Sequence, residues 1–164
     1  MGKFALITET DAISMYSPCY DGEQMHEFAK FLVSNRDHSH PQLKKFFYTI
    51  LAKIHKMEEC GARENLFRPE GGKIKAMPLY VELPRINRKV GKLRLYCIRI
   101  SERLLILGNG GVTTVNKYED DPFLLSCVGN LRTIEKKLRR EVKKAGTDYD
   151  DFDAVKQIIE TVNI

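Results

Sequence analysis

The sequence has no tryptophan, few cysteines and no apolar run close to the roughly 18–20 residues that cross a membrane as a helix. Neighbouring cysteines are at least 30 residues apart, whereas zinc ligands usually come in closely spaced pairs. We therefore expect no metal site, no cofactor and free thiols in a reducing compartment at Cys19, Cys60, Cys97 and Cys127. The apolar run at residues 4–7 is too short for a signal-peptide core and reads as a strand, which favours a cytoplasmic protein.

The overall composition is that of an ordinary folded domain. Of 164 residues, 43% are hydrophobic and 30% are charged, so a packed core is expected and wholesale disorder is not. A chain of this length leaves little room for two domains. The sequence therefore predicts a single domain over residues 1–164.

Charge is unevenly distributed along the chain. The net charge is +5, and residues 73–103 contain nine Lys and Arg against two acids. Residues 132–144 contain seven more cations, again against two acids. Segregated positive charge attracts polyanions, so RNA is the expected partner. For the second segment, the solvated face of an ordinary helix explains the lysines equally well.

The first half of the chain predicts one strand and two helices. Residues 3–7 form a short strand candidate, and Asp21 with Gln24 has the pattern of a capping box that starts a helix. A second helix begins at Pro41 and ends at Gly61, because its apolar residues recur in steps of three and four. The short polar link at residues 35–40 predicts that the two helices form a hairpin.

The second half predicts strands and then two more helices. Residues 73–83, 93–100 and 104–107 read as strands, with a basic loop at residues 84–91. The Asn109-Gly110 pair predicts a hairpin turn, with residues 112–115 returning as a strand. Helices then follow from Pro122 to the residues before Gly146, and from about Phe152. The fold class is therefore α+β: a helical hairpin packed on a small, mostly antiparallel sheet, followed by two C-terminal helices.

Three sequence features could carry chemistry but have simpler interpretations. The glycines at 108–111 lack the spacing of a phosphate-binding loop, and a turn explains them. The acids at 119–121 precede Pro122, where Asp121 caps a helix and the helix dipole stabilises negative charge. Structural or solvent-facing roles are favoured for the four histidines, because no convergent ligand set accompanies His26, His38, His40 and His55.

The strongest candidate site combines cations and one tyrosine on the predicted strands. Cleavage of RNA by its own 2′-hydroxyl needs cations for the developing phosphate charge and a group that moves protons. Arginine and lysine suit the first task, and tyrosine suits the second or stacks on a base. The candidate residues are Lys73, Lys75, Arg94, Tyr96, Arg99 and Arg103. In an unbroken strand, Arg94 and Tyr96 share one face while Arg99 points to the other.

On these residues the chain resembles a known family. The stretch Lys92–Leu107 (KLRLYCIRISERLLIL), with the preceding GGKIKAMP of residues 71–78, is similar to the consecutive strands of the RelE/ParE superfamily of bacterial toxins, in its RelE- and HigB-like branch. The resemblance covers residues 20–116 and implies a core over residues 1–118. Residues 119–164 would form a helical C-terminal extension that makes this chain longer than the family norm.

The resemblance implies a function. The protein would be a toxin of a toxin–antitoxin system that cleaves messenger RNA on the ribosome without a metal and is inhibited by an antitoxin protein. It places Arg99 and Arg103 at the scissile phosphate with Tyr96 as the third catalytic residue. The RNA-binding residues would be Lys73, Lys75, Arg88, Lys89, Lys92 and Arg94. No cation follows Val112 before Lys117, where many family members carry one, so two alternatives stay open: a non-catalytic RNA-binding or regulatory module, or a domain that binds an acidic protein.

Overall fold

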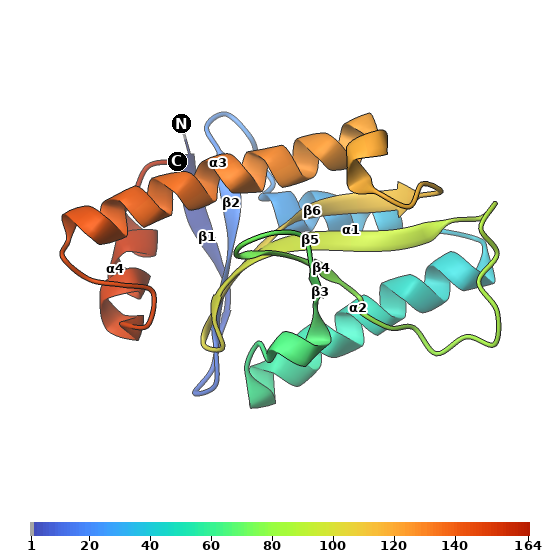
Figure 1. The fold of residues 1–164 in the computed structure, drawn as a ribbon, viewed down its shortest axis with the longest axis horizontal. Helices are drawn as coiled ribbons and strands as arrows, with labels where there is room; N and C mark the ends of the chain where they lie inside the picture. The colour runs from blue at the N-terminus through green and yellow to red at the C-terminus, as the bar shows by residue number, and fades with distance from the viewer. Residues whose placement is uncertain (1) are drawn as a thin grey trace.

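The computed structural model describes residues 2–164, which fold as an α+β protein with one six-stranded sheet between two pairs of helices (Figure 1). The sheet is mixed and its strand order is β1-β2-β6-β5-β4-β3. Neighbouring strands are antiparallel except β2 and β6, which run parallel. The strands are β1 (Gly2–Glu9), β2 (Ser14–Tyr20), β3 (Arg68–Pro69), β4 (Ile74–Met77), β5 (Lys92–Ser101) and β6 (Leu104–Thr113).

The predicted class is correct and most strand pairs are antiparallel as predicted, but the sheet is mixed because β2 and β6 run parallel, and the order of elements differs from the prediction. The prediction had one strand before the first helix, whereas the structure has the pair β1 and β2. Strand β2 was missed because Pro18 cannot donate a ladder hydrogen bond and its neighbours do not alternate in polarity. The first helix therefore begins later than predicted, and Asp21 does not cap it.

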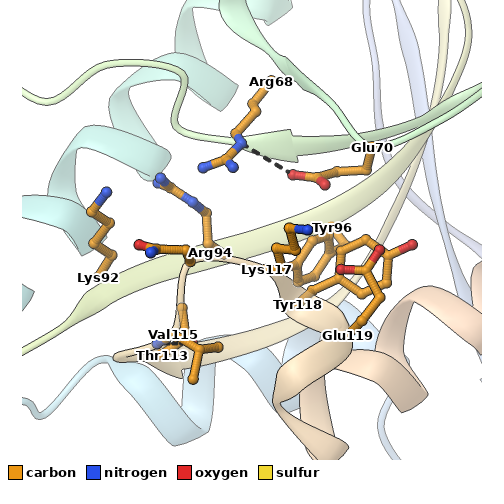
Figure 2. A pocket seen from close by; sticks show the side chains of 11 residues that line it. Arg68, Glu70, Lys92, Arg94, Tyr96, Thr113, Val115, Lys117, Tyr118 and Glu119 are labelled. Atoms are coloured by element: carbon orange, nitrogen blue, oxygen red, sulfur yellow. Dashed lines mark hydrogen bonds and ion pairs between the residues drawn. The ribbon is translucent and has the colours of Figure 1, made fainter.

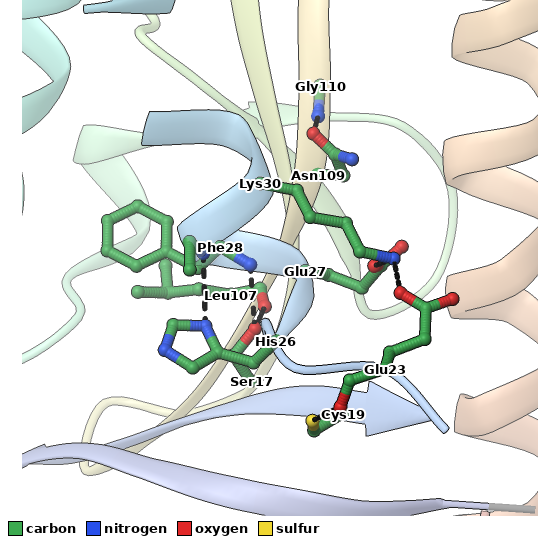
Figure 3. Close-up of polar contacts among 11 residues, drawn as sticks. Ser17, Cys19, Glu23, His26, Glu27, Phe28, Lys30, Leu107, Asn109 and Gly110 are labelled. Atoms are coloured by element: carbon green, nitrogen blue, oxygen red, sulfur yellow. Dashed lines mark hydrogen bonds and ion pairs between the residues drawn. The ribbon is translucent and has the colours of Figure 1, made fainter. Parts of the chain in front are cut away.

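Helices α1 (Glu27–Asn35) and α2 (Pro41–Cys60) pack on one face of the sheet. Their aromatic rings meet where Phe31 stacks on Phe47 at 6.2 Å. The start of α1 is fixed by Ser17 of β2, whose buried hydroxyl accepts from the Phe28 amide and donates to the Leu107 carbonyl of β6 (Figure 3). The ring of His26 caps α1 by accepting from the Ala29 amide (Figure 3).

The predicted bounds of α2 are confirmed. The helix begins with Pro41 at its first position, and Gly61 ends it with a φ of 80°. The ring of His40 accepts from the Gln42 amide and so caps the helix. Structural roles also fit the remaining histidines, since His38 hydrogen-bonds Asn35 and His55 lies 3.7 Å from Glu58.

Helices α3 (Pro122–Lys144) and α4 (Phe152–Thr161) pack on the opposite face of the sheet. As predicted, Asp121 caps α3 by accepting from the amides of Phe123 and Leu124. The apolar stripe of α3 is buried against β5 and β6, and Val155 and Ile159 of α4 complete this second core. The segment predicted as a C-terminal extension thus covers one whole side of the sheet.

The predicted hairpin at Asn109-Gly110 is wrong, because β6 continues through it to Thr113. These glycines serve close packing instead of a turn. A Cβ atom on Gly110 would overlap the carbonyl oxygen of Arg94 on β5, and one on Gly108 would crowd Leu131 of α3. Residues 112–115 are therefore not a returning strand: the first two end β6.

The segment between β4 and β5 positions the candidate site. Strand β4 is shorter than predicted, and the chain from Pro78 to Gly91 has no regular element, in agreement with the predicted basic loop. Two short 3-10 helices, Glu64–Leu66 and Tyr118–Asp120, precede β3 and α3. Over residues 2–164, no helix has both the length and the apolar character to cross a membrane.

Candidate functional site

The three predicted catalytic residues do not lie together. Arg94 and Tyr96 leave β5 on the α3 side of the sheet, whereas Arg99 leaves it on the α2 side, as strand alternation predicts. Arg103 lies in the turn between β5 and β6, with its guanidinium carbon 3.7 Å from the centre of the Phe152 ring. Tyr96 is 2% exposed and meets Tyr118 edge to face.

Arg99 has structural partners. Its Nε donates to the Ala62 carbonyl at 2.5 Å, and its terminal nitrogen lies 3.5 Å from Glu64. The side chain is 13% exposed. These contacts tie the chain after α2 to the centre of the sheet.

The predicted RNA-binding residues divide into two groups. Lys92 and Arg94 line one cavity, and exposed Arg88 lines the adjoining hollow with Lys92. Lys89 is exposed in the same basic loop. Away from this cavity, Lys73 lies with its ammonium 5.7 Å from the centre of the Tyr149 ring. Lys75 is half-buried on β4, paired with Cys97.

The cavity has a volume of about 260 Å³ and lies where β3, the start of β5 and the segment after β6 meet (Figure 2). The charged ends of Arg68, Lys92 and Arg94 gather on one side of it, and the rings of Tyr96 and Tyr118 on the other (Figure 2). Its lining residues are Arg68, Glu70, Lys92, Arg94, Tyr96, Thr113, Val115, Asn116, Lys117, Tyr118 and Glu119.

Local structure explains how Arg94 comes to line a cavity although it is only 8% exposed. It faces the cavity because Leu93 and Leu95 fill the core on the other side of β5. Strand β4 ends at Met77, and the Arg94 guanidinium donates to the Pro78 carbonyl at 3.2 Å just beyond that end. The remaining guanidinium donors are thereby held at the wall of the cavity.

Positive charge accumulates in the cavity beyond what its carboxylates balance. Burial, and then the charge of Arg68, lower the pKa of Arg94. Burial, followed by the charges of Arg94, Arg68 and Arg88, lowers the pKa of Lys92. The Arg68 guanidinium lies 3.4 Å from the Glu70 carboxylate (Figure 2). The cations thus repel one another, which an anion bound among them would relieve.

Glu70 differs from the other charged groups of the cavity. Burial raises its pKa, and this effect outweighs the opposing charges of Arg68, Arg94 and Arg132. Burial also raises the pKa of Tyr96, so that its hydroxyl stays protonated near neutral pH. Glu70 is accordingly the better candidate for accepting a proton in this cavity.

Sequence reasoning did not single out Arg68, Glu70, Lys117 or Tyr118. Arg68 begins a strand of only two residues and Glu70 follows it, and so short a strand has no detectable hydrophobic period. Lys117 and Tyr118 lie between the predicted returning strand at residues 112–115 and the helix predicted from Pro122, in a segment for which the sequence predicts no element. Among residues 2–164, no group of three or more His, Cys, Asp or Glu side chains is arranged to hold a metal ion.

Comparisons with known proteins give no assignment. No protein-family model, curated protein or solved structure matches the chain.

Proposed function

We propose that this protein binds RNA and that the cavity between β3, β5 and the segment after β6 holds a phosphate group of the strand. The observation that carries the proposal is the convergence of four cations from separate parts of the chain on one small cavity. Arg68, Lys92, Arg94 and Lys117 line it, against the carboxylates of Glu70 and Glu119.

The chemistry of the lining suits phosphate. Guanidinium groups present several N–H donors in a plane and match phosphate oxygens in pairs. Arg94 is held by the Pro78 carbonyl, so binding would cost little side-chain entropy. Tyr118 is half-buried at the wall opposite Arg68, Lys92 and Arg94 and offers a ring on which a base can stack (Figure 2).

RNA is favoured over an acidic protein because the cations continue past the cavity. Arg88 and Lys89 extend the positive surface along the exposed loop, which suits a chain of evenly spaced charges. An acidic protein would more commonly meet an interface with an apolar centre, whereas this cavity has more polar than apolar lining residues.

The test removes two cavity cations that do not fill the core. Arg68→Ala with Lys92→Ala should weaken binding of a single-stranded oligouridine and flatten its dependence on salt by about 0.7 per lost phosphate contact. Lys45→Ala with Lys56→Ala removes the same charge from exposed positions on α2 and serves as the control. Equal binding by both variants, or an acidic protein partner that binds while RNA does not, would overturn the proposal.

RNA cleavage is a second candidate function, supported by the position of Glu70. A carboxylate of raised pKa beside two arginines could take the proton of a 2′-hydroxyl while the cations hold the phosphate oxygens. The 2′-oxygen would attack phosphorus and expel the 5′-oxygen, which would receive a proton from Lys92, whose pKa is lowered. The products would be a 2′,3′-cyclic phosphate and a 5′-hydroxyl.

This second candidate keeps the toxin hypothesis and its antitoxin partner, but Glu70 and Lys92 take the catalytic roles in place of Arg99, Arg103 and Tyr96. Induced expression should then arrest growth and fragment messenger RNA, and Glu70→Gln should abolish both while RNA binding persists. If expression of the parent protein has neither effect, RNA binding without cleavage is the function to retain.

A further inference from the structure

Two further hollows adjoin the cavity along helix α3. The first lies between α3 and the turn from β3 to β4, and it is lined by Gly71, Gly72, Lys73, Ile74, Arg132, Glu135, Lys136 and Arg139. The second lies beside the end of α3 and shares Lys73 and Arg139 with the first. The three hollows therefore form a row on one side of the molecule.

Arg132 joins the cavity to the first hollow. Its guanidinium donates to the Glu70 carbonyl at 2.8 Å and to the Tyr118 hydroxyl at 3.0 Å, and both of those residues line the cavity. The same guanidinium lies beside Gly71, where an added Cβ atom would come within 3.2 Å of it. The backbone of the turn thus packs directly beside Arg132 at the boundary between the cavity and the first hollow, and a ligand that occupies both would cross over them.

Cations line the row throughout. Lys73, Lys136 and Arg139 surround the first hollow, and Lys143 lines the second. The carboxylate of Glu135 is buried and paired with Arg139, and Asp148 lies at the far end. The positive charge of the cavity therefore continues along α3 instead of ending at Arg132.

Tyrosine rings lie at both ends of the row. Tyr118 lies at the cavity, and half-buried Tyr149 lines the last hollow with Lys73 near its ring. Cations that follow a backbone, with aromatic rings on which bases stack, are the usual elements of a single-strand binding groove. From Arg132 to Lys143 the helix advances about 16 Å, which corresponds to roughly four to five stacked nucleotides at about 3.4 Å each.

We infer that the row is a binding groove for single-stranded RNA, which enters the phosphate cavity and then follows α3 past Lys136 to Lys143. The inference rests on the proposed RNA binding and extends it from one phosphate to a strand of defined path. Within the basic segment 132–144, RNA would then contact only the side of α3 that carries Arg132, Lys136, Arg139 and Lys143. Lys137 and Lys144, on other sides of α3, do not line the row.

The experiment compares a short and a long ligand on the same proteins. The dinucleotide pUpU fills little more than the cavity, whereas an oligouridine of about twelve nucleotides reaches the whole row. The groove variant is Lys136→Ala with Lys143→Ala, and the matched control is Lys137→Ala with Lys144→Ala on the same helix. Binding is measured over a range of salt concentrations, and thermal melting checks that each variant is folded.

For the parent protein, the long ligand should bind more tightly than the short one and with a steeper salt dependence. The groove variant should lower the slope for the long ligand by about 1.4, at about 0.7 per phosphate contact on a single strand, and leave binding of the dinucleotide unchanged. The control should behave like the parent. If the groove variant and the control bind the long ligand equally, the inference fails while the phosphate cavity stands. If neither ligand binds the parent protein, the proposed function itself fails.

Discussion

Arg68 and Arg94 come from strands β3 and β5, yet they lie close enough in one cavity that burial and then the charge of Arg68 lower the pKa of Arg94. Like charges held together in a partly buried site destabilise the unliganded fold. The Glu70 carboxylate, 3.4 Å from Arg68, balances only part of this charge, because Lys92 and Arg94 line the same cavity. An anion in the cavity should therefore stabilise the protein, which gives the first prediction.

Inorganic phosphate should raise the melting temperature more than chloride at the same ionic strength. A ligand at a hundredfold excess over its Kd adds about 2.7 kcal/mol to the free energy of unfolding, or roughly 5–10 °C for a domain of this size. Differential scanning fluorimetry checks this. The rise should disappear in Arg68→Ala with Lys92→Ala. An equal rise in that variant would place the phosphate elsewhere.

Arg99→Ala should destabilise the fold, because it leaves the Ala62 carbonyl without the hydrogen bond that Nε donates to it. The expected loss is about 1–3 kcal/mol in the free energy of unfolding, measured by urea denaturation. RNA binding by the folded variant should equal that of the parent. The catalytic role that the family resemblance implies for Arg99 would give the opposite result, namely lost activity with native-like melting, so measuring stability and binding together decides between the two.

Gly110→Ala should be far more damaging than a glycine substitution at an open position on the surface of α3. A methyl group at Gly110 would overlap the Arg94 carbonyl oxygen, so β5 and β6 would have to separate. The expected cost is about 3 kcal/mol or more, in the range of severe packing defects. Gly129→Ala is the control, since Gly129 is exposed on α3 with open space around it, and alanine there should stabilise by roughly 0.5–1 kcal/mol.

Acid should weaken the ion pairs that join α4 to β1. Lys156 lies 2.8 Å from Glu9 and 3.0 Å from Glu160, and its hydrogen bond is the main cause that lowers the pKa of Glu9. The hydrogen bond from Tyr16, and then that from Lys156, lower the pKa of Glu160.

A carboxyl group whose pKa is lowered on folding stabilises the fold fully at a pH above its ordinary pKa of 4.5. This stabilisation is lost as the pH falls through the lower pKa of the folded state. The melting temperature of the parent should therefore fall more steeply between pH 5 and pH 3 than that of Lys156→Gln. Parallel curves for the two proteins would show that these pairs contribute nothing measurable.

Local chemistry explains which parts of the fold the sequence could predict. Helix α2 begins at Pro41 and ends at Gly61 because proline and glycine impose backbone angles on their own. The glycines of β6 led to a wrong prediction of a turn, because the atoms that require glycine there are distant in sequence. They are the Arg94 carbonyl on the neighbouring strand and the Leu131 side chain of α3. Glycine is favoured both in tight turns and where two backbones approach closely, so its presence alone does not distinguish the two.

The candidate site was predictable only in part, for a similar reason. Alternation along β5 correctly placed Arg94 and Tyr96 on one face and Arg99 on the other. Arg68 and Lys117 reach the same cavity from segments with no periodic pattern, so only the three-dimensional arrangement brings them to Arg94.

The parallel pairing of β2 with β6 has a consequence for how the chain folds. The Ser17 hydroxyl bonds the Leu107 carbonyl across 90 residues of sequence, and this bond joins the β1–β2 ribbon to the rest of the sheet. Contacts between distant segments form slowly, because the entropy of closing the intervening loop must be overcome first. During synthesis, the ribbon emerges from the ribosome long before its partner strand exists. Met15 and Tyr16, both fully buried in the finished fold, are then exposed to water and to chaperones until β6 has been made.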